Sequence, residues 1–308
     1  MLSLGRKWLM HIDQLTLKNF RNFESVDIPL NSKMNIVIGN NGSGKSSLLM
    51  GALTAASAFF LGIDYASPRS IKTDDVRHVA HEVNKVCQQV AVYPVEVSCE
   101  GVVNGVTCKW SRSLSGPKSN TTYGGASDLR NIASSLQKSA SNEYSEDVLP
   151  LIAYYGTGRL WAQKQAKKKG KQKLKSRFEG YQDCIAEQAT DKQLLEWFSE
   201  TTLLVSQEGA IPQMTAVQQA LERCFADLID HDETQKVKVE YRQRYRTIVV
   251  EYTNRRGERE LHPMYEMSDG YRSVLSMVAD IAHRMAVLNP QLDDAILETP
   301  GVIIIDEV

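Results

Sequence analysis

The feature that most constrains this chain is a glycine-rich segment between an apolar run and a stretch rich in leucine and alanine. Residues 39–46 read Gly-Asn-Asn-Gly-Ser-Gly-Lys-Ser and match the pattern G-x-x-x-x-G-K-S/T. Glycines let the backbone curve around a polyphosphate with its N–H groups pointing inward, and the helix that follows adds its positive N-terminal end. We interpret the segment as a phosphate loop rather than as a chance glycine turn.

The phosphate loop assigns roles to individual side chains. Lys45 is expected to reach the β- and γ-phosphates of ATP, and the Ser46 hydroxyl is expected to bind Mg²⁺. ATP and Mg²⁺ are therefore the predicted cofactors. The predicted nucleotide ligands in this segment are Gly39, Asn40, Asn41, Gly42, Ser43, Gly44, Lys45, Ser46 and Ser47.

A second motif is a run of branched apolar residues that ends in two acids. Residues 302–305 precede Asp306 and Glu307. Such a run is typical of a central parallel strand, which delivers its last residues to the sheet edge where ligands bind. Asp306 is then expected to hold Mg²⁺ with Ser46, and Glu307 to orient or deprotonate the attacking water as the catalytic partner of Lys45. An ordinary strand that ends in solvated acids is the alternative.

A third motif, Met-Ser-Asp-Gly at residues 267–270, precedes an expected helix over 268–288. A helix N-cap is one interpretation of Ser268. In order with the other two motifs, the segment resembles the signature loop of ABC ATPases, usually Leu-Ser-x-Gly, with Met267 in place of leucine. The resemblance implies that Ser268 and the Gly270 N–H cover the γ-phosphate held by a second copy. It also implies that the protein self-associates through heads that enclose ATP.

The opening segment, residues 17–23, reads Leu-Lys-Asn-Phe-Arg-Asn-Phe and resembles the first strand of RecF/SMC-type heads. The resemblance makes Arg21 and Asn22 nucleotide candidates, although a structural turn explains them equally well. The spacing of the motifs is closer to RecF, to OLD-family heads and to the PtuA-like ATPases of Septu and retron-associated antiphage systems than to SMC proteins with long arms. Residues 149–161 also resemble the PtuA-like group; there Arg159 is a phosphate or partner contact, or a turn arginine.

The resemblance implies an α/β fold, a P-loop NTPase of ABC-ATPase type with a mixed core sheet. The pattern of the residues adds an antiparallel β portion over 89–114 and a helical insertion over 178–228. We expect an extension at 1–9, a first lobe at 10–160, a basic loop and helical insertion at 161–235, and a second lobe at 236–308. Met10 is an alternative start.

Family heads continue past the two acids, so we expect the C-terminal part of the head to be missing here. Residues 1–308 alone are expected to hydrolyse ATP poorly and to retain some ATP binding. Robust turnover by this chain would refute that expectation.

Periodicity predicts the remaining elements. Strands are expected at 25–30, 34–38, 149–155, 236–241, 247–252 and 301–306, and a helix at 44–61. Asn104-Gly105 is a strong hairpin signal, and a break at 209–212 divides the helical insertion.

Composition narrows the class of protein. A chain that is 42% hydrophobic and 24% charged belongs to the ordinary globular class. Its five cysteines form no C-x-x-C pair, which indicates a reduced, cytoplasmic setting. The longest apolar stretch, residues 51–63, is too short for a bilayer span, so no membrane association is expected.

A net charge of −1 means that any nucleic-acid contact must be local. One segment between Trp161 and Phe178 carries eight basic residues and no acid. DNA or RNA contact, a solvated loop and a protein partner all remain open for it. The basic residues are Lys164, Lys167, Lys168, Lys169, Lys171, Lys173, Lys175 and Arg177. A second cationic stretch, residues 241–246, is expected at a hairpin tip.

The leading hypothesis is an ATPase that acts as a nucleotide switch in a DNA-directed antiphage complex and controls a nuclease partner of HNH type. One alternative is a RecF-like repair or recombination ATPase. A second is a scaffold that binds ATP without hydrolysing it and so holds an assembly together.

Overall fold

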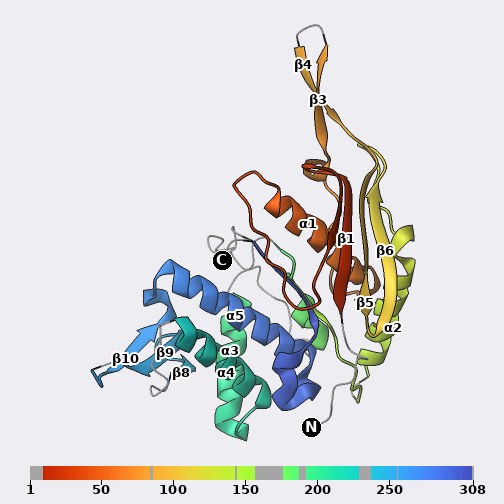
Figure 1. Cartoon of the computed structure of the whole chain (residues 1–308). Helices are drawn as coiled ribbons and strands as arrows, with labels where there is room; N and C mark the ends of the chain where they lie inside the picture. Colours follow the sequence, from red (N-terminus) through yellow and green to blue (C-terminus); the bar gives the residue numbers. More distant parts are fainter. Residues whose placement is uncertain are drawn as a thin grey trace. The chain divides into compact units, whose positions relative to one another are not determined.

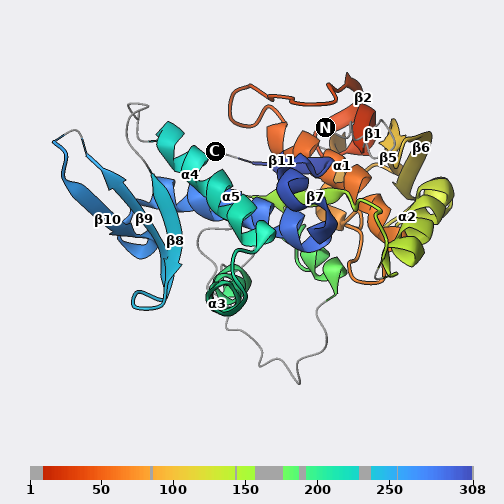
Figure 2. The ribbon, with the colours of Figure 1, turned by 90° about the horizontal axis from the view of Figure 1, so that it is seen from below.

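The computed structural model describes residues 10–83, 86–142, 144–156, 176–186, 192–228, 237–254 and 256–306. The chain divides into two compact units (Figures 1 and 2). The first unit comprises Met1–Tyr154, Asp183–Ile185 and Pro300–Glu307. The second comprises Tyr155–Gln182 and Ala186–Thr299 with Val308. The four-part division expected from the sequence stays a prediction.

An antiparallel sheet forms the body of the first unit. Its order is β2 (Phe23–Pro29), β1 (His11–Phe20), β5 (Val95–Val103) and β6 (Val106–Leu114). Alternate residues of β5 are buried along its whole length, as a strand with one covered face requires. The register of β1 shifts between Ile12 and Gln14, and this bulge turns both Ile12 and Leu15 into the core although they are three residues apart.

Helix α1 (Lys45–Ala56) covers one face of this sheet and continues into η2 (Ser57–Gly62) (Figure 1). The helix lies close because Gly51 has no side chain; a Cβ there would stand 2.6 Å from Leu17 Cδ2. Trp110 Nε1 donates to the Ala55 carbonyl at 2.9 Å and fixes the helix on β6. The segment Lys45–Gly62 is apolar and long enough for a membrane span by composition, but 67% of it is buried, as in a core helix.

Shorter elements complete the first unit. The predicted Asn104-Gly105 turn is confirmed, with φ angles of 50° and 74° that suit a two-residue hairpin. The remaining elements are η3 (Thr73–Asp75), the hairpin β3 (His78–Val83) and β4 (Val86–Ala91), η4 (Gly124–Ala126) and α2 (Ser127–Ala140). Helix α2 and strand β3 were not predicted. Figure 1 shows the β3–β4 hairpin extending away from the sheet.

The acid-tipped strand is β11 (Gly301–Ile305), and it pairs with β7 (Leu151–Tyr155). The backbones of these two strands are so close at Gly301 that a Cβ there would lie 2.0 Å from the Leu151 carbonyl oxygen. The expectation of a fully buried central strand is only partly met, since Ile304 is buried and Ile303 is 36% exposed. Among the described residues, β7 is the one strand paired with β11.

The strand predicted at residues 34–38 is wrong. These residues form no strand, and Ile38 is 89% exposed. Asparagine side chains hold the preceding backbone in a loop instead. Asn35 Oδ1 accepts from Asn31 N–H at 2.7 Å, and Asn35 Nδ2 donates to the Asn31 carbonyl at 2.8 Å. Such local bonds compete with strand pairing, which would need a hydrogen-bonded neighbour.

The second unit combines a three-stranded sheet with helices. The sheet has the order β10 (Arg259–Pro263), β9 (Thr247–Thr253) and β8 (Lys238–Arg242). The helices are η6 (Arg177–Tyr181), α3 (Lys192–Glu208), α4 (Pro212–Leu228), η7 (Met264–Glu266), α5 (Asp269–Leu288) and η8 (Pro290–Glu298). Apolar side chains from α3, α4, α5 and the sheet form one core. Figure 2 shows the three strands side by side with α4 and α5 alongside.

The strands predicted at 236–241 and 247–252 correspond to β8 and β9, and the helix predicted at 268–288 corresponds to α5. The helical insertion breaks where expected, at Gly209 with φ 94°, a conformation that favours glycine. Strand β10 was not predicted. The cationic stretch lies at the β8–β9 turn, where Arg244 and Arg246 are exposed.

Candidate nucleotide-binding site

The phosphate loop, residues 39–46, leads directly into helix α1, whose first two residues are Lys45 and Ser46. Gly42 and Gly44 have φ angles of 82° and 96°, which side-chain-bearing residues rarely adopt. Gly44 is the N-cap of α1, no side chain caps the helix, and its first turn contains no acid. The backbone N–H groups at this helix end therefore remain available to an anion.

Lys45 folds back over the loop that precedes it. Its Nζ donates to the carbonyl oxygens of Gly39 at 2.7 Å and Asn40 at 3.0 Å. A Cβ on Gly39 would lie 2.6 Å from Ser43 Oγ, so the Ser43 side chain would have to move to accept it. Phosphate oxygens could take the place of these carbonyl oxygens as acceptors for the ammonium group.

Ser46 and Asp306 come together although 260 residues separate them in the sequence. Ser46 Oγ donates to Asp306 Oδ1 at 3.3 Å. Hydroxyl and carboxylate oxygens are ligands that Mg²⁺ accepts, and neighbouring oxygens in its octahedral shell lie about 2.9 Å apart. The two side chains therefore fit a shared Mg²⁺, whose remaining positions water and phosphate oxygens would fill.

The turn between β1 and β2 lies against the phosphate loop. A Cβ on Gly44 would lie in tight contact with the Phe23 ring, at 3.1 Å, and the φ angle of 96° itself favours glycine at this position. Arg21, in the same turn, has a φ angle of 49°, and its N–H donates to the Asp75 carbonyl at 2.8 Å. Asn22 is exposed beside it. The structure thus places Phe23, which follows the predicted candidates Arg21 and Asn22, against the loop, and the nucleotide contacts of these two residues stay a prediction.

Asp75 is a residue of this region that sequence reasoning missed. Its buried carboxylate accepts hydrogen bonds from Arg21 Nε and Arg69 Nη2, each at 2.8 Å. Burial alone would raise the pKa of Asp75, but the hydrogen bonds and charge of Arg69, with help from Lys72 and Arg21, bring the pKa below its usual value. No sequence spacing signals this contact, because it joins a turn to a short 3-10 helix 54 residues away.

The signature-like loop lies in the second unit. Ser268 is the N-cap of α5, yet its side chain makes no capping hydrogen bond. Ser268, Asp269 and Gly270 are exposed, and a Cβ on Gly270 would meet nothing within 4 Å. The N-cap interpretation therefore explains the position of Ser268 but leaves its hydroxyl without a role in the helix.

Several predicted residues fall outside the described part of the chain. Glu307, Arg159 and the basic residues 164–175 belong to this group. Arg177, the last residue of the basic segment, is described. Its Nε donates to the Leu288 carbonyl at 2.6 Å and its Nη2 to Asn289 Oδ1 at 3.0 Å, so it ties η6 to the end of α5.

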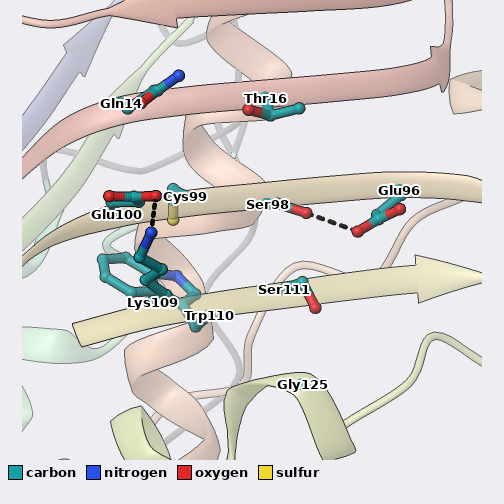
Figure 3. Close-up of a pocket in the computed structure, with 10 residues that line it drawn as sticks. All are labelled: Gln14, Thr16, Glu96, Ser98, Cys99, Glu100, Lys109, Trp110, Ser111 and Gly125. Atoms are coloured by element: carbon teal, nitrogen blue, oxygen red, sulfur yellow. Dashed lines mark hydrogen bonds and ion pairs between the residues drawn. The ribbon is translucent and has the colours of Figure 1, made fainter.

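A polar pocket of about 320 Å³ lies elsewhere in the first unit, on the outer face of β1, β5 and β6 (Figure 3). Its charged groups satisfy one another: Lys109 pairs with Glu100, and Ser98 donates to Glu96 at 2.8 Å. No residue of the phosphate loop lines it. We therefore assign it no part in nucleotide binding.

Comparison with known proteins agrees with the geometry. The sequence profile described as "AAA domain" matches residues 14–229. The probable ATPase of retron Ec83 from Escherichia coli is 23% identical over 97% of this chain, and the chain spans 63% of that relative. The DNA replication and repair protein RecF of Colwellia psychrerythraea is 48% identical over 71 residues, which are 23% of this chain and 16% of RecF.

Among solved structures, the SMC head domain from Thermotoga maritima is similar to this chain at 13% sequence identity and a TM-score of 0.44. The alignment covers 97% of this chain and 90% of the SMC head chain. The predicted resemblance to RecF/SMC-type ABC ATPase heads, and to retron ATPases, is confirmed by the profile and the sequence relatives. The predicted fold class, a P-loop ATPase with mixed sheets and helices, is also confirmed.

Proposed function

Since this chain belongs to the AAA domain family, we propose that it binds ATP together with Mg²⁺ at the phosphate loop and acts as an ATPase of RecF/SMC type. Lys45 and the N-terminal end of α1 bind the phosphates, and Ser46 and Asp306 bind Mg²⁺. Glu307, which follows Asp306 directly, orients or deprotonates the attacking water. The other nucleotide ligands are the rest of the loop and the adjacent turn with Arg21 and Asn22.

The observation that carries this proposal is the 3.3 Å contact between Ser46 Oγ and Asp306 Oδ1. Two motifs from opposite ends of the chain, each predicted to bind the same ion, meet through oxygen atoms. If Ser46 only stabilised the first turn of α1, a hydrogen bond to a carboxylate 260 positions away would not be expected.

Calorimetry tests the site directly. Wild-type protein titrated with ATP should show binding that strengthens with Mg²⁺. Lys45→Ala should weaken ATP binding about tenfold or more, because it removes a charge-assisted contact. Lys33→Ala, an exposed lysine in the preceding loop, is the matched control and should bind ATP like wild type. Asp306→Asn should abolish the gain from Mg²⁺ while leaving metal-free ATP binding unchanged. Equal ATP affinity for wild type and Lys45→Ala would refute the proposal.

The exposed Ser268–Gly270 segment supports a second part of the proposal. Two copies enclose ATP, with Ser268 and the Gly270 N–H of one copy at the γ-phosphate held by the other. Sedimentation of the protein with ATP and Mg²⁺ should then show dimers, which Ser268→Arg should prevent by its bulk and charge. A monomer at all ATP concentrations would contradict this part alone.

For the biological role we propose a nucleotide switch in a DNA-directed antiphage complex that controls a nuclease partner of HNH type. The similarity to retron ATPases supports this role, because it extends over 97% of the chain. A RecF-like role in DNA repair is the second candidate, favoured by the higher identity to RecF, 48% over 71 residues. Purification of the tagged protein from its native cells separates the two: a nuclease partner supports defence, and recombination mediators support repair.

A further inference from the structure

Arg21 uses one edge of its guanidinium group to hold Asp75. Nε of Arg21 donates to Asp75 Oδ1 at 2.8 Å. Among the described residues, none accepts a hydrogen bond from the two Nη groups of Arg21, and its side chain is 26% exposed. The Nη groups at the outer edge of the guanidinium group can therefore donate hydrogen bonds to a ligand.

Arg69 holds Asp75 from a second direction. Its Nη2 lies 2.8 Å from the Asp75 carboxylate, and the Lys72 N–H donates to Asp75 Oδ2 at 2.9 Å. Arg69 is 8% exposed and Asp75 is 1% exposed, so both are largely removed from water. One carboxylate faces two guanidinium groups, and the cluster keeps a net positive charge. Arg21 is its more exposed cation.

The cluster is anchored to the helix that follows the phosphate loop. Arg69 Nη1 donates to Thr54 Oγ1 at 2.7 Å, and the Arg69 N–H donates to Ser57 Oγ at 3.0 Å. Thr54 is in α1 and Ser57 begins η2, and both are fully buried. The chain of contacts from Arg21 through Asp75 and Arg69 thus ends on the same helix whose first turn carries the phosphate loop.

We infer that Asp75 is a positioning residue for ATP: with Arg69, it fixes the Nε edge of Arg21 so that the Nη edge binds oxygen atoms of the ATP phosphates. Two features point to this role. The turn that carries Arg21 lies against the phosphate loop through the contact of Phe23 with Gly44. The excess positive charge of the cluster also favours an anion at its exposed end. The inference rests on the proposed ATP site.

A double-mutant cycle on the full chain tests the inference, with Mg·ATP affinity measured by calorimetry. Arg21→Gln should weaken ATP binding about 10- to 100-fold, as expected for loss of a charge-assisted hydrogen bond. Asp75→Asn should weaken it about 5- to 10-fold, because Arg21 remains but is no longer held. In the Arg21→Gln background, Asp75→Asn should cause no further loss. Asp74→Asn, the exposed neighbour, is the matched control and should bind ATP like wild type.

The outcomes separate this inference from the proposed function. If Lys45→Ala binds ATP like wild type, the ATP site itself is wrong. If Lys45→Ala weakens binding but Asp75→Asn does not, or if Asp75→Asn weakens it equally with and without Arg21, the positioning role is wrong. If Asp75→Asn does not fold, Thr54→Val tests the positioning role instead, because it removes the acceptor for Arg69 Nη1. It should weaken ATP binding only when Arg21 is present, and an equal loss in both backgrounds overturns the inference.

Discussion

Asp75 and Glu251 are each held between two arginines, yet their surroundings differ. Asp75 lies in the first unit with 1% of its side chain exposed, and its partner Arg69 is 8% exposed. Glu251 lies in the second unit on strand β9 with 15% exposed, and its partner Arg259 is 71% exposed. The same arrangement of charges is therefore more deeply buried in the first unit than in the second.

The comparison teaches that the number of ion pairs says little about their contribution to stability. Water and salt screen the pairs of Glu251, and exposed pairs typically contribute between about 0 and 1 kcal/mol. The charges of Asp75 and Arg69 have lost most of their water, so each depends on the other. Removing one partner of such a pair costs about 3 to 5 kcal/mol. A buried cluster of this kind holds its members in one geometry, as a binding site requires.

The largest expected effect is that of Asp75→Ala. This change leaves Arg69 buried without its carboxylate and should lower the free energy of unfolding by about 3 to 5 kcal/mol. Urea denaturation followed by circular dichroism measures it. Asp74→Ala removes an exposed carboxylate from the same short helix and should change stability by less than about 0.5 kcal/mol. If the two changes lowered the stability equally, burial would not explain the expected importance of Asp75.

The contrast also shows what the sequence could predict. Contiguous patterns predicted the phosphate loop, helix α1, the hairpin turn at Asn104-Gly105 and the strand that ends at Asp306, because each depends on local conformation and periodicity. Helix α2 was missed although its signal is present: Leu129, Ala133, Leu136 and Ala140 recur at helical spacing and are all buried.

Other features depend on tertiary contacts that no local pattern encodes. The apolar residues 34–38 have the composition of a strand, but asparagine side chains hold the chain before them in a loop. Asp75 stands in an ordinary polar stretch, and only the fold brings it to Arg21 and Arg69. The meeting of Ser46 with Asp306 could be predicted because both motifs are typical of one binding site.

Arg112 offers a third case, because among the described residues this buried cation has no carboxylate partner. It is 1% exposed, and among the described residues neither Nη atom has a hydrogen-bond partner. Its Nε donates to the Thr122 carbonyl at 2.7 Å, and the guanidinium group lies 5.4 Å from the centre of the Tyr123 ring. Burial lowers the pKa of Arg112, although Tyr123 opposes the shift.

Arg112→Met should therefore raise the free energy of unfolding by about 1 kcal/mol, because an apolar side chain of similar length needs no hydrogen bonds. Urea denaturation measures the change, and Arg130→Met at an exposed position of α2 is the control with no expected effect. A clear loss of stability would mean that the guanidinium group is well satisfied where it lies.

A smaller effect is expected for Glu251→Gln at neutral pH. The change removes the charge that pairs with Arg242 and Arg259. It should lower the free energy of unfolding by no more than about 1 kcal/mol, and the difference should shrink in high salt. Urea denaturation at two salt concentrations measures this, with Glu266→Gln as the exposed control. A loss as large as that of Asp75→Ala would show that exposure does not separate the two clusters.

The smallest effect is the pH dependence of that difference. The Arg259 hydrogen bond, with those of Arg242 and the charges of both arginines, lowers the pKa of Glu251 from 4.5 to about 2 against the effect of burial. A carboxylate with a lowered pKa stabilises the fold above its unfolded pKa and loses that contribution as the pH falls towards the folded value. The difference between wild type and Glu251→Gln should thus be constant above pH 5 or so and decline between about pH 4.5 and 2. Urea midpoints of both proteins at a series of pH values measure this decline. If the stability difference between wild type and Glu251→Gln grew as the pH fell, the ion pairs of Glu251 could not be its cause.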